Sequence, residues 1–289
     1  MNEDLILFLQ EPYFLTILLV TVLIALCASL MGVTLVLKRY SLIGDGLSHV
    51  AFGVMSVAIV AGVTNDMLVV FPVTVITAIL LLMGGQKRMI KGDSALAMVS
   101  VGALAIGYLL RSAFPASAAN GVSSDVCDTL FGGLNLLTLS EEKVRLCIIL
   151  SIVVVLAFVL FYHKIFAVTF DESFAAATGS NTTLYNLVIA VIIAMIVVLG
   201  MQLVGSLLIS ALVVFPAMSA MRVFKSFRSV TICSVVISVL CSFFGLLVNA
   251  VCSFQYHLEI PVGPTIVVAD IVVFLVFSLM GMIRGRRTA

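Results

Sequence analysis

The stretch LYNLVIAVIIAMIVVLGMQLVGSLLISALVVFP runs from Leu184 to Pro216 without a single charged side chain. A helix that crosses the hydrocarbon core of a bilayer needs about 20 apolar residues, with a range of about 17–25. The stretch therefore holds either one unusually long helix or two helices that reverse between them. The choice decides how often the chain crosses a membrane and on which side its C-terminus lies.

The composition of the whole chain places it in a membrane. Of 289 residues, 63% are hydrophobic and only 10% are charged, whereas a soluble domain carries about 25% charged residues. No basic stripe indicates nucleic acid. Hydrocarbon cannot satisfy a free backbone amide, so each span is expected to be helical. We predict an all-α, polytopic integral membrane protein that forms one domain over residues 1–289 and has the lipid bilayer as its surroundings.

Apolar runs of sufficient length predict about nine spans, at 13–37, 42–62, 67–85, 94–112, 146–162, 184–199, 202–221, 229–252 and 265–283. Between them, residues 113–143 predict an external loop with a short helix that dips into the membrane. Residues 253–264, which contain two prolines, predict a compact external loop.

The distribution of Lys and Arg decides between eight and nine spans. With nine spans and the N-terminus outside, every Lys and Arg except Arg111, Lys143 and Arg145 lies on the cytoplasmic side. Fusing the sixth and seventh spans would move all basic residues from Arg222 onward to the outside. Because basic residues concentrate in cytoplasmic loops, we predict a tight reversal near 200–202, an external N-terminus and a cytoplasmic C-terminus.

Asp45 and His49 are the first candidate functional residues. Ionisable groups inside spans are costly and usually mark function. Residues four apart lie on one helix face, and a carboxylate oxygen with an imidazole nitrogen suits zinc, manganese or iron. Flanking Gly44 and Gly46 would let another backbone or an ion approach closely. Two alternatives stay open: a buried Asp–His hydrogen bond that holds this helix to a neighbour, and a role for Asp45 as a helix-start cap.

Three further side chains are weaker metal candidates. Asp270, in the last span, is either a carboxylate of an ion pathway or a polar contact between helices. His257 and Glu259, in the loop before that span, would receive an ion at the outer mouth, or would simply face water.

Residues 168–179 form a cytoplasmic segment with the features of a short helix. Asp171 and Glu172 open it, alanines including Ala175 and Ala176 favour a helix, and Gly179 can cap its end. A short helix of small residues between two spans fits a docking surface for another protein, and equally an ordinary amphipathic connector.

Five motifs, taken together, resemble a known family. They are GDGLSH at 44–49, LFGG at 130–133, FDESFAAATG at 170–179, VGSLLISALVVFPA at 204–217 and PVGPTIV at 261–267. In this order they resemble motifs in the permease subunits of ABC-type zinc, manganese and iron importers. Gly133 departs from the pattern, which usually has an acid there.

The resemblance implies a homodimeric, multi-pass permease of the bacterial cell membrane, with Asp45 and His49 as transient ligands of the transported ion. Zinc, manganese or iron would be substrate, with no tightly bound cofactor. Two cytoplasmic ATPase subunits would dock on the 168–179 segments, and an external or periplasmic metal-binding protein would deliver the ion. The chain itself would not be an enzyme, and its sequence holds no G-x-x-x-x-G-K-[S/T] phosphate loop.

A second class of function stays open beside this one. The chain could be an ion-coupled secondary transporter or channel for a divalent cation that works without an ATPase. Such proteins often contain inverted repeats and broken helices, and no internal repeat is visible here. The number of intramembrane acids is also small for a proton relay.

Overall fold

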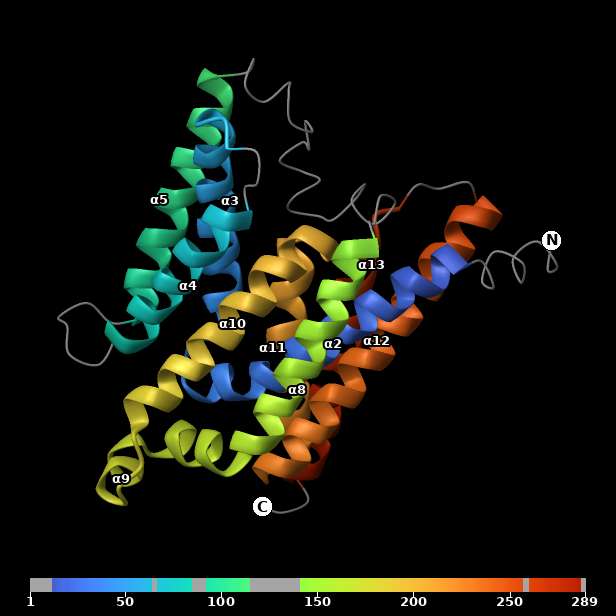
Figure 1. The fold of residues 1–289 in the computed structure, drawn as a ribbon. Coiled ribbons are helices and arrows are strands. Elements are labelled where there is room, and N and C mark those ends of the chain that lie inside the picture. The colour runs from blue at the N-terminus through green and yellow to red at the C-terminus, as the bar shows by residue number, and fades with distance from the viewer. Residues whose placement is uncertain (1–11, 64–66, 85–91, 115–140, 257–259, 287–289) are drawn as a thin grey trace.

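The computed structural model describes residues 12–63, 67–84, 92–114, 141–256 and 260–286. Every regular element among these residues is helical (Figure 1). The helices are α2 (Pro12–Leu37), α3 (Ile43–Val60), α4 (Met67–Gly84), α5 (Gly92–Ala113), α8 (Glu141–Phe170), α9 (Glu172–Ala177), α10 (Thr182–Val204), α11 (Ser206–Val223), α12 (Phe227–Tyr256) and α13 (Val262–Arg286).

The predicted all-helical bundle is confirmed. Nine of these helices coincide with the predicted spans, and eight of them, among the described residues, are long and apolar enough to cross a membrane. The remaining one is α4, whose described apolar part is Leu68–Leu82. The predicted dipping helix within 113–143, the LFGG motif, His257 and Glu259 lie outside the described residues.

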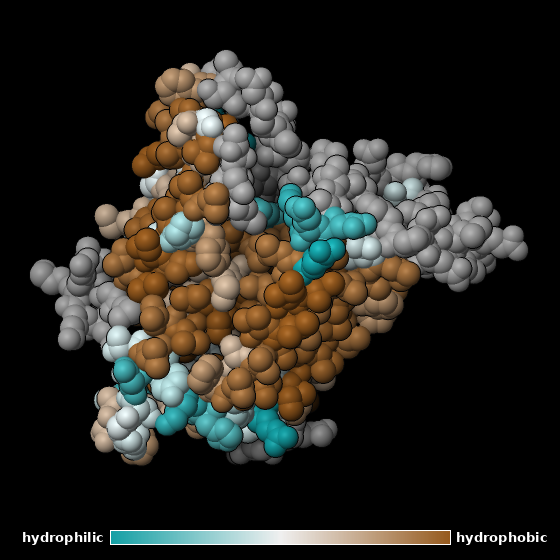
Figure 2. All heavy atoms as spheres, viewed as in Figure 1, coloured by the Kyte–Doolittle hydropathy of each residue, from teal (hydrophilic) through white to brown (hydrophobic). Residues whose placement is uncertain are grey.

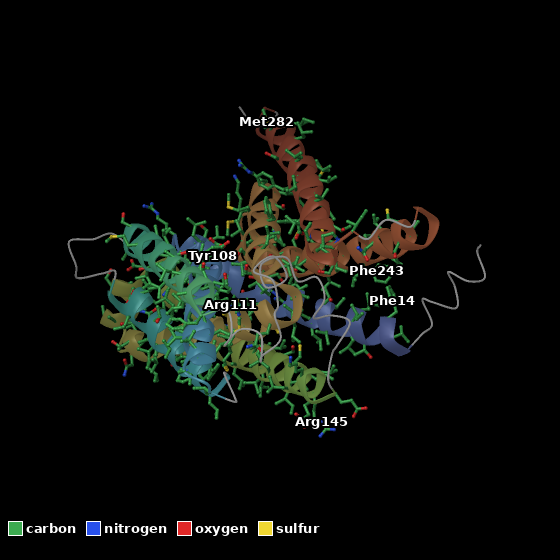
Figure 3. The ribbon with its side chains drawn as sticks, turned by 90° about the horizontal axis from the view of Figure 1, so that it is seen from above. Phe14, Tyr108, Arg111, Arg145, Phe243 and Met282 are labelled. Atoms are coloured by element: carbon green, nitrogen blue, oxygen red, sulfur yellow. The ribbon has the colours of Figure 1, made fainter. Side chains whose placement is uncertain are left out.

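The exposed surface of the bundle is apolar where lipid would lie. Helices α2, α10 and α11 are mostly buried, whereas α5, α8 and α13 expose large hydrophobic side chains such as Leu109, Leu160 and Met282. On the face of the molecule that Figure 2 shows, apolar side chains form a broad band, with hydrophilic side chains gathered toward its edges. Seen from above, α13 projects from the bundle with Met282 at its outer part (Figure 3). Lipid contact explains this exposure, since water would penalise it.

The boundary between α10 and α11 confirms that the charge-free stretch holds two helices. The chain breaks at Gly205, whose φ of +94° lies in the region that favours glycine. A Cβ placed on Gly200 would lie 2.2 Å from Cδ1 of Ile209. In one continuous helix these residues would be about 13.5 Å apart along the axis, so α11 folds back on α10.

The predicted position of this reversal, 200–202, is a few residues early. Gly200 is inside α10, where its missing side chain leaves room for Ile209, and only Gly205 takes the left-handed φ. In Figure 1, α2 begins at the right of the view, and α13 ends at its lower edge. The number of crossings and the membrane side of each terminus stay predictions.

Helices α3 and α5 approach each other closely through small residues. A Cβ on Gly53 of α3 would lie 2.6 Å from the carbonyl oxygen of Ala103 in α5, and one on Gly107 would meet Phe52 at 3.0 Å. Such contacts are typical of membrane helices, in which small residues let two backbones pack together. They fix the orientation of α3, the helix that carries Asp45 and His49.

Exchanging Gly53 for Ala is therefore expected to destabilise the protein by about 1–3 kcal/mol, the usual cost of overpacking. Gly102→Ala is the matched control, because a Cβ there meets nothing within 4 Å; it should be neutral or stabilise by up to about 1 kcal/mol through helix propensity. Thermal unfolding midpoints in detergent would measure both. Equal midpoints for the two variants would contradict the close α3–α5 packing.

Candidate functional site

Asp45 and His49 lie one turn apart at the start of α3. Nε2 of His49 is 3.4 Å from Oδ2 of Asp45. The imidazole is mostly buried, with 16% of its side chain exposed, while 48% of the Asp45 side chain is exposed. Neighbours on other faces of α3, including Ile43 and Leu47, are fully buried. The predicted juxtaposition is confirmed, and the carboxylate remains open to an incoming ion.

The alternative that this pair ties α3 to a neighbouring helix finds no support in the geometry. Both side chains belong to α3, so their contact joins two turns of one helix. Nδ1 of His49 is buried and, within the part of the chain that the structure describes, has no hydrogen-bond partner. A buried nitrogen without a partner is costly, and a bound metal ion or water would satisfy one imidazole nitrogen.

The alternative that Asp45 caps the start of α3 is not supported either. The N-cap of α3 is Leu42, which makes no side-chain capping bond, and Asp45 is the third helical residue. Its negative charge in the first turn still interacts favourably with the helix dipole. Ser48 bonds back to the carbonyl oxygen of Asp45 at 2.7 Å, which keeps its hydroxyl on its own helix.

The two glycines that flank Asp45 bring other helices close to it. A Cβ on Gly44 would be 3.7 Å from Cα of Ser210 in α11, and one on Gly46 would be 2.4 Å from Cδ1 of Leu96 in α5. At Gly44 this is ordinary van der Waals contact, whereas Gly46 leaves room for a side chain of α5. The expected close approach of another backbone or an ion stays a prediction.

Asp270 sits in a different environment. It is 1% exposed on α13, which packs against α11 and α12, and the thiol of Cys241 in α12 lies within hydrogen-bonding reach of its carboxylate. The described residues contain no group of three or more His, Cys, Asp or Glu side chains arranged to hold a metal ion. Asp270 is thus not combined with Asp45 and His49 into a larger ligand set within one chain.

The 168–179 segment, whose first three residues belong to the end of α8, contains the expected capped helix, α9. Asp171 is its N-cap, and one carboxylate oxygen accepts hydrogen bonds from the Phe174 amide at 2.9 Å and the Ser173 hydroxyl at 2.6 Å. These bonds, the hydroxyl one foremost, lower the pKa of Asp171. Within α9, Phe174 and Ala176 are exposed, whereas Ala175 is buried.

The C-terminus of α9 depends on Gly179. This residue has φ of +81°, and its amide donates to Ala176 while the next amide, of Ser180, donates to Ala175. The two bonds form a Schellman motif, in which a left-handed residue closes the helix. The predicted cap is confirmed, whereas the role of α9 as a docking surface stays a prediction.

Sequence reasoning missed two polar residues beside α9. Lys38 follows α2, and Asn186 lies in the first turns of α10. Asn186 donates a hydrogen bond to Glu172. Lys38 donates one to Asn186 and interacts with the charge of Glu172. The signal for Asn186 was present, because it is an amide within an otherwise apolar span. Its partner lies 148 positions away in the sequence, and that pairing was not readable.

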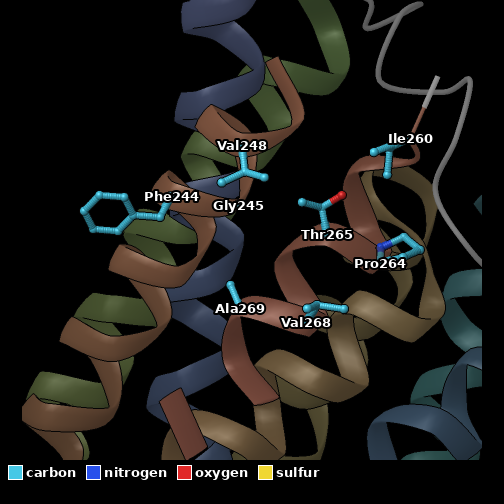
Figure 4. Close-up of a pocket in the computed structure, with 8 residues that line it drawn as sticks. All are labelled: Phe244, Gly245, Val248, Ile260, Pro264, Thr265, Val268 and Ala269. Carbon is cyan, nitrogen blue, oxygen red and sulfur yellow. The ribbon is translucent and has the colours of Figure 1, made fainter. Parts of the chain in front are cut away.

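An apolar cavity beside Asn249 and the start of α13 does not resemble a metal site. It has a volume of about 380 Å³ and lies between α12 and α13, lined by Phe244, Gly245, Val248, Ile260, Pro264, Thr265, Val268 and Ala269 (Figure 4). None of these side chains is a carboxylate, imidazole or thiol. The cavity offers room for apolar groups such as lipid chains, and no ligand for an ion.

Comparison with known proteins points to one family. Residues 10–281 match the ABC 3 transport family. The chain is 27% identical to the manganese import system permease protein ScaB of Streptococcus parasanguinis, covering 93% of this chain and 91% of that protein. It is 30% identical to a probable metal transport system membrane protein of Thermotoga maritima, covering 88% and 85%.

A solved structure supports the fold independently. The structure described as PsaBC from Streptococcus pneumoniae in complex with Fab superposes with a TM-score of 0.78 at 23% identity, covering 96% of this chain and 95% of that chain. At this level of identity the similarity extends to the fold alone.

Proposed function

This chain belongs to the ABC 3 transport family, and from that premise we propose that it is the permease subunit of an ATP-driven importer of a divalent transition metal ion. It is a multi-pass protein of the bacterial cell membrane. The observation that carries the proposal is the Asp45–His49 pair on α3, with an exposed carboxylate and a buried imidazole nitrogen without a partner. A cation passing along α3 would meet oxygen and nitrogen ligands there.

Manganese is the first candidate for the transported ion. Several relatives are named as manganese import permeases, and carboxylate together with imidazole fits Mn²⁺ as well as Zn²⁺ and Fe²⁺. Geometry and availability, more than affinity order, decide selectivity among these metals. Zinc and iron are therefore the alternatives against which manganese must be measured.

A homodimer would complete the ligand shell. One chain supplies two ligands, and within the described residues no third ligand joins them. A two-fold axis would bring a second copy of the same pair to the ion. Four ligands drawn from two chains that move apart can also release the ion, which a transport site requires and a structural metal site does not.

We expect two kinds of protein partner, a cytoplasmic ATPase subunit and an external metal-binding protein. Its sequence has no phosphate loop, so ATP would be hydrolysed by a separate subunit docked on α9. The aromatic ring of Phe174, 65% exposed on this short helix, offers an apolar contact for such a subunit. An external binding protein would deliver the metal ion.

The test is whether metal uptake requires the ATPase. Vesicles that contain the chain together with its ATPase subunits are expected to accumulate metal only when ATP is supplied. Equal uptake by the chain alone would instead favour an ion-coupled secondary transporter or a channel.

A further inference from the structure

Three polar side chains from three separate elements form one hydrogen-bonded chain beside α9. Nζ of Lys38, the residue after α2, donates to Oδ1 of Asn186 in α10. Nδ2 of the same amide donates to Oε1 of Glu172, the first residue of α9, at 2.8 Å. The three side chains also line one polar cavity of about 250 Å³. Asn186 thus connects an ammonium group to a carboxylate.

This chain of bonds is partly shielded from water. Asn186 is 7% exposed, and Lys38 and Glu172 are half-buried. Burial lowers the pKa of Lys38, and the nearby charge of Glu172 opposes that shift. Hydrogen bonds to charged groups in such surroundings are stronger than neutral ones, and breaking one leaves a buried polar group unsatisfied. The three elements are therefore expected to move together.

Lys38 also begins the turn that leads into α3. Arg39 has φ of +63°, a left-handed conformation that a non-glycine residue takes at a cost. The amides of Arg39 and Tyr40 donate to the carbonyls of Val36 and Leu35, which closes α2 in a Schellman motif. The amide of Ile43 in turn donates to the carbonyl of Tyr40, so hydrogen bonds continue from this turn into the first turn of α3, where Asp45 lies.

We propose that the Lys38–Asn186–Glu172 chain couples movement of α9 to the position of Asp45 and His49. This inference rests on the proposed function, because it assigns Lys38 and Asn186 as positioning residues between the ATPase docking helix and the metal ligands. Docking or nucleotide-driven displacement of α9 would pull on Glu172, then on Asn186, and then on the turn between α2 and α3. Neither Lys38 nor Asn186 needs to touch the ion or the ATPase.

The test separates transport from ATP hydrolysis. Lys38→Met and Asn186→Leu are each expected to lower Mn²⁺ uptake per ATP hydrolysed by about tenfold in vesicles that contain the complete complex, within the range of ordinary coupling free energies. The double variant should be no worse than either single one, because both interrupt the same series of bonds. Lys38→Arg should retain most of the coupling.

Two further variants serve as controls. Asn186→Asp keeps the size of the side chain and its acceptor for Lys38. It replaces the donor to Glu172 by a carboxylate oxygen that repels the Glu172 carboxylate, so it should lower uptake per ATP hydrolysed without a packing defect. Lys164→Met is the matched control. Nζ of Lys164 donates to the Ser180 hydroxyl at 3.0 Å, at the exposed C-terminal end of α9. Loss of this bond should leave the ratio of metal uptake to ATP hydrolysis unchanged.

The proposal is overturned if Asn186→Asp and Lys38→Met keep the wild-type ratio of uptake to hydrolysis, or if their effects multiply in combination. These outcomes presuppose a wild-type complex with ATP-driven uptake. A wild type without it would refute the proposed function instead.

Discussion

Replacing Asp45 by Asn is expected to abolish metal uptake while the complex still assembles and hydrolyses ATP. The substitution removes the negative charge and nearly keeps the shape of the side chain. A neutral amide is a much poorer oxygen donor to a divalent cation than a carboxylate. Because loss of an outer-shell partner alone costs about 10–100-fold in metal affinity or activity, loss of a ligand should lower uptake at least that far.

His49→Ala should have the same effect, since it removes the nitrogen ligand and the buried, unpartnered Nδ1. Ser48→Ala is the matched control on the same turn. Its hydroxyl bonds the backbone of its own helix, so its removal should leave uptake nearly unchanged. Initial rates of radiolabelled Mn²⁺ uptake, normalised to folded protein and to ATP hydrolysis, would compare the three variants. Near-normal uptake by Asp45→Asn would show that Asp45 and His49 make only a structural contact.

Exchanging Gly179 for Val is expected to weaken retention of the ATPase subunits by about tenfold. Gly179 has φ of +81°, and a Cβ there would meet nothing within 4 Å. The cost is therefore one of backbone conformation, about 1–2 kcal/mol for an L-residue in the left-handed region, and about 1.4 kcal/mol corresponds to a factor of ten in affinity. The strain falls on the Schellman motif that shapes the end of α9.

Gly62→Val provides a close control for this experiment. Gly62 also has a left-handed φ, of +70°, and also has open space around it, but it follows α3 at the end remote from α9. It should cost similar stability and leave the ATPase bound. Co-purification yield and ATP hydrolysis by the isolated complex measure the difference. If both variants retain the ATPase equally, α9 is an ordinary connector.

The sequence predicts the helices well because lipid imposes a length and a composition on each span. Every predicted span has a helix at its position, and the distribution of Lys and Arg correctly indicates that the stretch around Gly205 holds two helices. The exact point of reversal was not predictable. Either Gly200 or Gly205 could end a helix. In the structure, Ile209 packs against Gly200 inside α10, and the helix ends at Gly205.

The candidate site was partly predictable for a similar reason. The i,i+4 spacing of Asp45 and His49 is a property of one helix, so their contact follows from local geometry. The capping of α9 by Asp171 and Gly179 is local as well. The bonds from Lys38 to Asn186 and onward to Glu172 join elements far apart in the sequence, and no periodicity reports such a pairing.

The most direct test of the central claim is uptake measured metal by metal with the complete complex. Proteoliposomes would contain the permease with its ATPase subunits and enclose ATP, and the external binding protein would be loaded with radiolabelled Mn²⁺, Zn²⁺ or Fe²⁺. We expect ATP-dependent accumulation of a divalent metal, with Mn²⁺ first, that disappears in Asp45→Asn and in vesicles without the ATPase. Accumulation that is equal with and without ATP and the ATPase, or that is the same in Asp45→Asn, would contradict it.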